Sequence, residues 1–215
     1  MNKSLYPLML SDRVVQAIDA LAAQSGTNRS NMVNQILADY VSYITPEKRM
    51  EQVFGEMEHL LTGRDSFQVL LRGNSSILNM RSALTYKYNP NVRYSVELYR
   101  GGEAAFGELR VTMRTKNHSL LLYIMQFFKL WMRIESSYVP GCQYAVSDGR
   151  FTRKLMLRMD MEVTGEELGR MLSDYVGAFD GALKAFFYHL DEPQQAVAQV
   201  EKCYREYYQN CGPRL

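Results

Sequence analysis

The first 44 residues contain two short amphipathic helical patterns that are too small to enclose a hydrophobic core. The first pattern follows Ser11, a good helix N-cap, and stops at Gly26. Its apolar face consists of Val15, Ile18, Leu21 and Ala22. The second pattern follows Asn28, and its apolar face consists of Val33, Ile36, Leu37, Tyr40, Val41 and Ile44. Two helices of this size bury too little surface to fold alone, so the segment requires a partner.

Residues 4–10, with the sequence SLYPLML, are predicted to form a strand before the first helix. This strand, the turn SGTNRSNM and the helix RSNMVNQILADYV resemble the ribbon-helix-helix family of bacterial DNA-binding regulators, over residues 4–44. The resemblance implies an intertwined homodimer in which two strands pair into an antiparallel ribbon that enters the major groove of double-stranded DNA. It also implies that the N-terminus of the second helix holds a phosphate group through Asn28, Arg29 and Ser30.

The alternation of side chains along this strand predicts which residues face the dimer core and which face DNA. A register anchored at Leu10 directs Tyr6 and Leu8 inward as well. The expected dimer interface consists of Tyr6, Leu8, Leu10, Val33, Ile36, Leu37 and Tyr40. The expected DNA-facing residues of the strand are Lys3, Leu5, Pro7 and Met9. Because base edges are normally recognised by hydrogen bonds, the apolar members of this set leave open whether the strand binds DNA or only dimerises.

Positive charge is concentrated in the middle of the chain. The net charge is +2, and residues 1–44 carry three basic and three acidic side chains, whereas residues 64–116 carry nine basic and four acidic ones. The basic residues of the strand-rich region are Arg72, Arg81, Lys87, Arg93, Arg100, Arg110, Arg114 and Lys116. They form either a solvated sheet face or an auxiliary surface for the DNA backbone or for an acidic partner.

Residues 45–215 mix helical and strand patterns, which predicts a larger α+β domain with an antiparallel sheet packed on helices. Asp148-Gly149 is a strong signal for a two-residue hairpin turn, and Thr164 with Glu167 forms a capping box. Helices are expected near 45–61, 117–138, 164–190 and 193–210. Strands are expected near 66–71, 78–88, 92–100 and 106–115 and on both sides of the Asp148-Gly149 turn, with alternation continuing through 154–161.

Two of these helices carry further information. The helix over 117–138 is apolar nearly all round, with a narrow polar stripe of Gln126, Lys129 and Arg133. Such a helix is covered on most sides, by a sheet and by either another helix or a second subunit. The tyrosines at 204, 207 and 208 share one side of the last helix. They are predicted to cover a surface of the same molecule, with a ligand-binding aromatic cluster as the alternative.

The order helix, strands, helix, hairpin, helix, helix is similar in topology to the small α+β domains of type III secretion chaperones. That similarity rests on no motif. It implies dimerisation and binding of other polypeptides, and fold similarity alone does not establish function.

No catalytic or metal-binding constellation is evident. The histidines at 59, 118 and 189 are scattered, and no glycine-rich phosphate loop or paired metal-ligand motif occurs. We therefore expect a protein that is not an enzyme and that needs no cofactor or metal. Cys142, Cys203 and Cys211 are odd in number and are expected to be reduced thiols. With no signal pattern and no long apolar run, the sequence predicts a cytoplasmic bacterial protein that does not contact a membrane.

The leading hypothesis is a homodimeric transcription regulator. Its ribbon-helix-helix module, residues 1–44, binds operator DNA, and residues 45–215 sense an effector, bind a partner or stabilise the oligomer. The alternative is an interaction protein that uses the module only to dimerise and binds a polypeptide through its C-terminal domain. The sequence identifies neither the operator nor a protein or small-molecule effector.

Overall fold

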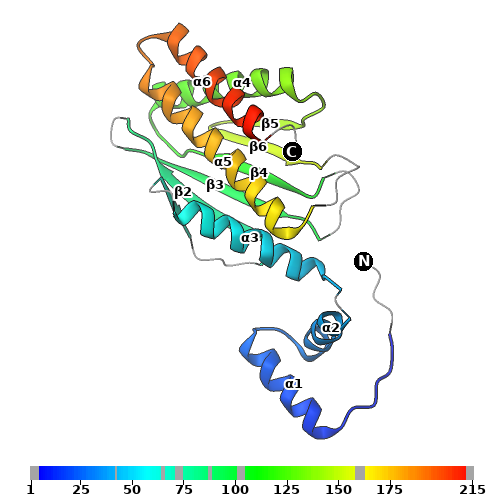
Figure 1. Cartoon of the computed structure of the whole chain (residues 1–215). Coiled ribbons are helices and arrows are strands. Elements are labelled where there is room, and N and C mark those ends of the chain that lie inside the picture. Colours follow the sequence, from blue (N-terminus) through cyan, green and yellow to red (C-terminus); the bar gives the residue numbers. More distant parts are fainter. Residues whose placement is uncertain are drawn as a thin grey trace. The chain divides into compact units, whose positions relative to one another are not determined.

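The computed structural model describes residues 5–41, 43–63, 66–70, 75–86, 89–100, 105–157 and 163–211. The chain divides into two compact units, Met1–Arg49 and Met50–Leu215, which we call unit 1 and unit 2. The division falls within helix α3 (Pro46–Thr62), shortly after the predicted boundary between residues 44 and 45. Six helices and six strands in the described part of the chain confirm the predicted α+β class (Figure 1).

Unit 1 contains the helices α1 (Asp12–Gln24) and α2 (Arg29–Tyr40), as their amphipathic patterns predict. Gly26, with a φ of 61°, lies in the left-handed conformation that suits glycine after the end of a helix. The Asn28 side chain accepts a hydrogen bond from the Asn31 N–H at 2.9 Å and so caps α2. Because α2 ends at Tyr40, the expected extension of its apolar face to residue 44 is wrong.

The core of unit 1 is very small. It consists of Ile18, Ala22 and Met32, with Val33 packed against them. Residues 5–10 have no regular secondary structure and are exposed, so the predicted strand does not form within one chain. A ribbon of two strands needs hydrogen-bond partners that the described part of a single chain does not offer.

Unit 2 is built on one six-stranded sheet. Its strands, in chain order, are β1 (Phe67–Val69), β2 (Ile77–Ala83), β3 (Asn91–Leu98), β4 (Gly107–Thr112), β5 (Tyr144–Ser147) and β6 (Arg150–Leu155). Their spatial order is β1-β2-β3-β4-β6-β5, and every neighbouring pair is antiparallel. The predicted alternation along β3 is confirmed, because Val92, Tyr94 and Val96 are buried while Arg93 is exposed. The alternation predicted over residues 158–161 lies outside the described residues.

Short-range signals place the turns and the helix ends of unit 2. Asp148 and Gly149 have φ values of 42° and 74°, as the predicted two-residue turn between β5 and β6 requires. Helix α4 (His118–Tyr138) is capped by Asn117. The predicted capping box is present at the start of helix α5 (Gly165–Tyr188), and helix α6 (Pro193–Cys211) follows a short turn.

Helices α3, α4 and α5 lie on one face of the sheet, and α6 packs on α4 and α5 (Figure 1). Phe179 of α5 is the centre of this packing, with ring centroids 4.9 Å from Trp131, 5.1 Å from Phe151 and 6.2 Å from Tyr94. Tyr204 of α6 lies 5.2 Å from Trp131, which confirms that the C-terminal tyrosines cover a surface of the same molecule. None of the described helices has the length and apolarity needed to cross a membrane.

Candidate functional site

The residues predicted to form the ribbon are exposed in the single chain. Leu8 and Leu10, predicted to face inward, are 59% and 43% exposed, whereas Leu5 and Met9, predicted to face DNA, are 96% and 103% exposed. Tyr6, also predicted to face inward, is strongly exposed, and Lys3 lies outside the described residues. Because residues 5–10 form no strand in the single chain, the predicted alternation stays a prediction.

The predicted phosphate-binding residues converge at the N-terminus of α2. Asn28 is engaged as the cap, and the N–H groups of Arg29 and Ser30 have no acceptor in the described part of the chain. The Arg29 guanidinium forms two hydrogen bonds with the Asp19 carboxylate of α1, at 2.7 and 2.6 Å. This contact lowers the pKa of Asp19 and raises that of Arg29, mainly through the hydrogen bonds. The start of α2 thus has two N–H groups without an acceptor among the described residues, as at helix N-termini that bind anions, while the Arg29 guanidinium is bound to Asp19.

The predicted dimer residues of α2 divide into two groups. Val33 is half-buried against the small core of unit 1, while Ile36, Leu37 and Tyr40 are 40%, 51% and 88% exposed. Ile36, Leu37 and Tyr40 thus form an exposed apolar face on α2, and the residues at 5–10 are a second exposed apolar segment of unit 1.

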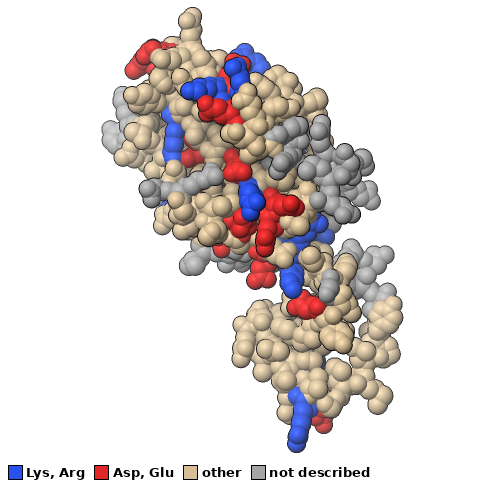
Figure 2. All heavy atoms as spheres, in the orientation of Figure 1, with Lys and Arg blue, Asp and Glu red and all other residues tan. Residues whose placement is uncertain are grey.

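Unit 1 has few charges with which to bind a polyanion. On the face shown in Figure 2, most of the described atoms of unit 1 belong to uncharged residues. Of its basic residues, Arg29 is paired with Asp19, and Lys48 is paired with Asp39 at 2.6 Å. Arg13, at the start of α1, is exposed. Electrostatic attraction to DNA would therefore be modest.

Most basic residues of the strands lie on the face of the sheet opposite the helices. We call this the open face, and its side chains include Arg81, Arg93, Glu97, Tyr99, Glu108, Arg110, Thr112, Arg150 and Lys154. Arg81 lies directly opposite Arg93, although like charges in that position destabilise a sheet. Arg114 and Lys116 follow β4 and are exposed, whereas Arg72 and Lys87 lie outside the described residues.

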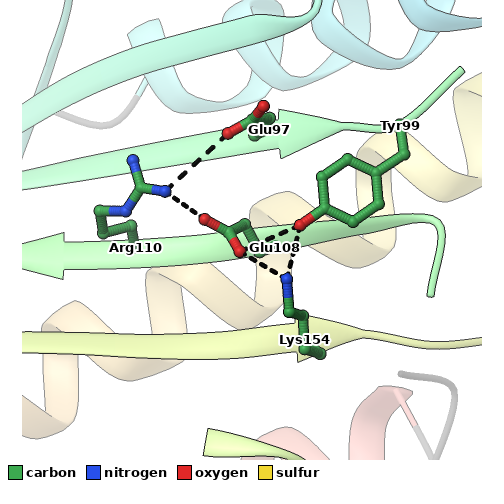
Figure 3. Close-up of polar contacts among 5 residues, drawn as sticks. All are labelled: Glu97, Tyr99, Glu108, Arg110 and Lys154. Carbon is green, nitrogen blue, oxygen red and sulfur yellow. Dashed lines mark hydrogen bonds and ion pairs between the residues drawn. The ribbon is translucent and has the colours of Figure 1, made fainter. Parts of the chain in front are cut away.

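Part of the open face is an ion-pair network (Figure 3). The Glu108 carboxylate accepts hydrogen bonds from Lys154 at 2.8 Å, from Tyr99 at 3.0 Å and from Arg110. Burial would raise the pKa of Glu108, but the hydrogen bonds from Lys154 and Tyr99 and the charges of Arg110 and Lys154 outweigh it and lower the pKa. The same contacts raise the pKa of Lys154 to about 12. The network neutralises its own charges and is a structural element of the sheet.

Sequence patterns did not predict a second ion pair, which lies inside unit 2. Arg153 of β6 and Glu135 of α4 are almost fully buried, with Nε and Oε1 3.0 Å apart. Glu135 also accepts hydrogen bonds from Tyr144 at 2.8 Å and Tyr175 at 2.9 Å. Burial and the charge of Glu135 raise the pKa of both tyrosines, so their hydroxyls stay protonated. The alternation of β6 places Arg153 on the inward face, which is the signal that identifies it.

The described residues contain no group of three or more histidine, cysteine or acidic side chains that could hold a metal ion. Cys142, Cys203 and Cys211 are free thiols, and burial raises the pKa of Cys203. A thiol with a raised pKa is a poor nucleophile. In comparisons with known proteins, the chain matches no family model, no curated protein and no solved structure.

Proposed function

We propose that the protein is a homodimeric DNA-binding regulator whose two N-terminal units fold together as a ribbon-helix-helix module. One observation carries the proposal. Of the sixteen large apolar side chains that are exposed in the described part of the chain, thirteen belong to unit 1. Unit 1 thus has a minimal core and a large apolar surface whose exposure to water is unfavourable. A second copy of unit 1 covers this surface and completes the core.

The position of this surface supports the ribbon-helix-helix arrangement. It includes residues 5–10 and Ile36, Leu37 and Tyr40 of α2, which are the two sets that a paired ribbon and a helix interface would cover. The capped N-terminus of α2, with Arg29 beside its N–H groups, provides one phosphate contact in each chain.

A second candidate function is dimerisation without DNA binding. It is favoured by the apolar residues Leu5, Pro7 and Met9 on the predicted DNA-facing side and by the engagement of Arg29 with Asp19. In that case the C-terminal domain would bind a polypeptide partner, and the N-terminal unit would only double the number of binding sites.

The two functions are separated by measuring assembly and DNA binding on the same full-length protein. Analytical ultracentrifugation gives the oligomeric state, and fluorescence anisotropy gives binding to the duplex upstream of the gene and to random duplex, at ~50 mM salt and above. The regulator is supported by a dimer whose affinity falls with salt and is higher for the upstream duplex. A stable dimer that binds neither duplex at ~50 mM salt leaves dimerisation as the function, and a monomer contradicts both.

The Asp19 contact offers a sharper test of the same site. In Asp19→Asn, the Arg29 guanidinium loses its carboxylate partner and becomes available to a phosphate, so affinity for both duplexes should rise. The matched control is Asp39→Asn, which removes the other ion-paired carboxylate of unit 1, at Lys48. An equal increase in both variants would show only the loss of negative charge and would argue against Arg29 as the phosphate contact.

A further inference from the structure

A groove lies in unit 2 where the turn between α5 and α6 meets α4. Its volume is about 460 Å³, within the range of small-molecule sites. Figure 1 shows α4 and α6 side by side near the end of α5. The residues that line the groove are Tyr123, Gln126, Lys129, Leu130, Arg133, Phe186, Leu190, Pro193, Ala196 and Val197.

The floor of the groove is apolar. Leu130, Phe186 and Ala196 are 8%, 7% and 2% exposed, so their side chains are fixed by packing against the core of unit 2. Val197, at the rim, is 36% exposed. A floor of this kind binds apolar groups and offers few partners for the hydroxyl groups of a sugar or the edges of a base.

The charged residues of the groove are all cations. Lys129 and Arg133 lie one helical turn apart on the exposed face of α4, in the polar stripe of that helix. No carboxylate lines the groove, and neither cation has an ion pair with any residue that the structure describes. Like charges at this spacing destabilise a helix slightly, and a bound anion would relieve that repulsion.

We propose that this groove binds a free amphiphilic carboxylate of the fatty-acid class. The apolar chain lies on Leu130, Phe186 and Ala196, and the carboxylate lies between Lys129 and Arg133. Two adjacent cations beside an apolar floor fit a ligand that has one negatively charged head group and one apolar chain. They repel a cationic amphiphile of the same length. The proposal concerns unit 2 and does not depend on DNA binding.

The test compares ligands that share a chain and differ in head group. Decanoate, decanol and decyltrimethylammonium are titrated into the full-length protein by calorimetry without DNA, the two ionic ligands below their micelle concentrations and decanol below its solubility limit. Decanoate should bind most tightly. Lys129→Gln and Arg133→Gln should each weaken decanoate binding about tenfold, because each removes a charge-assisted hydrogen bond, and should leave decanol binding unchanged.

Two further variants complete the test. Val197→Trp should abolish binding of both decanoate and decanol because it fills the groove from its exposed rim. Lys202→Gln removes an exposed cation of α6 outside the groove and should change nothing. Equal affinity for the three ligands, an equal loss in Lys202→Gln, or decanoate binding that survives Val197→Trp would each overturn the proposal. Circular dichroism confirms that each variant is folded.

Discussion

At the scale of single residues, the least expected feature is a charged pair inside an aromatic core. Arg153 is buried with its guanidinium carbon 4.7 Å from the centroid of the Tyr175 ring, and Trp131 donates a hydrogen bond to the Tyr175 hydroxyl at 3.0 Å. Glu135 of α4 links its helix to β6, β5 and α5 through Arg153, Tyr144 and Tyr175. Such a network fixes the register between helices and sheet, because its hydrogen bonds have one satisfactory geometry.

This pair predicts a strong asymmetry between single and double variants. Glu135→Ala should destabilise the protein by about 3–5 kcal/mol, since it leaves the Arg153 charge buried without its carboxylate. The double variant Glu135→Met, Arg153→Met should recover much of that loss because no buried charge remains. Urea unfolding followed by circular dichroism measures both values. A double variant as unstable as the single one would show that the tyrosine hydrogen bonds, and not the ion pair, dominate.

A second residue-scale prediction concerns the pH dependence of stability. The pKa of Glu108 in the folded protein lies below its ordinary value of 4.5. The ionised carboxylate therefore stabilises the fold above that pH, and the stabilisation is lost as the pH falls through the lower, folded pKa. Glu108→Gln should be less stable than the wild type at neutral pH and should lose less stability on acidification.

Thermal unfolding across the acid range checks this prediction. Glu97→Gln is the matched control, because its carboxylate contacts Arg110 only at 3.9 Å. If both variants change the pH profile equally, the effect arises from the total charge of the open face and not from the Glu108 network.

At the scale of the elements, the exposed apolar face of α2 predicts assembly. Leu37→Asp places a charge on the surface that a second chain would cover, so the full-length variant should sediment as a monomer in which unit 2 stays folded. Asn34→Asp is the control, since it adds the same charge at an exposed polar position of α2 and should remain a dimer. A Leu37→Asp protein that still dimerises would exclude the proposed interface.

The elements show which parts of the structure are predictable from sequence. Signals that act over a few residues, such as Asp148-Gly149 and the capping box of Thr164 with Glu167, placed turns and helix ends correctly. The pairing of β4 with β6 was not predicted, because it joins Gly107 to Leu155 across the whole of α4 and β5. A pairing between strands that are far apart in the chain leaves no pattern in the sequence of either strand.

The same distinction applies to the candidate site. Asn28 was predicted as the cap of α2 from local rules, and that cap is present. Arg29 was predicted as a phosphate contact from the resemblance to the ribbon-helix-helix family. The Asp19 partner of Arg29 was not, since its contact depends on how α1 and α2 pack. The groove was missed for the same reason: α4, α5 and α6 contribute to it from distant parts of the chain.

At the scale of the whole molecule, the proposed DNA binding predicts how affinity depends on salt. If DNA is held mainly through its backbone, the logarithm of the affinity falls by about 0.9 per phosphate contact for each log unit of salt. Arg29→Ala should reduce this slope by about two in the dimer, one for each chain, without changing sequence preference. Lys202→Ala in unit 2 is the charge-matched control. A slope that is unchanged in Arg29→Ala would exclude the predicted phosphate contact.

The minimal core of unit 1 also links the protein's behaviour to its abundance. If unit 1 dimerises as proposed, most of its folding free energy comes from association and rises with protein concentration, because Ile18, Ala22 and Met32 form only a small core. Unit 2 has its own extensive core, so its unfolding should not depend on protein concentration. Heating should thus give two transitions, of which only the lower one moves with concentration. In a cell, the proposed dimer would make the state of the N-terminal segment depend on the amount of protein: below the dissociation constant of the dimer the segment would be open to proteases, and above it the segment would be protected.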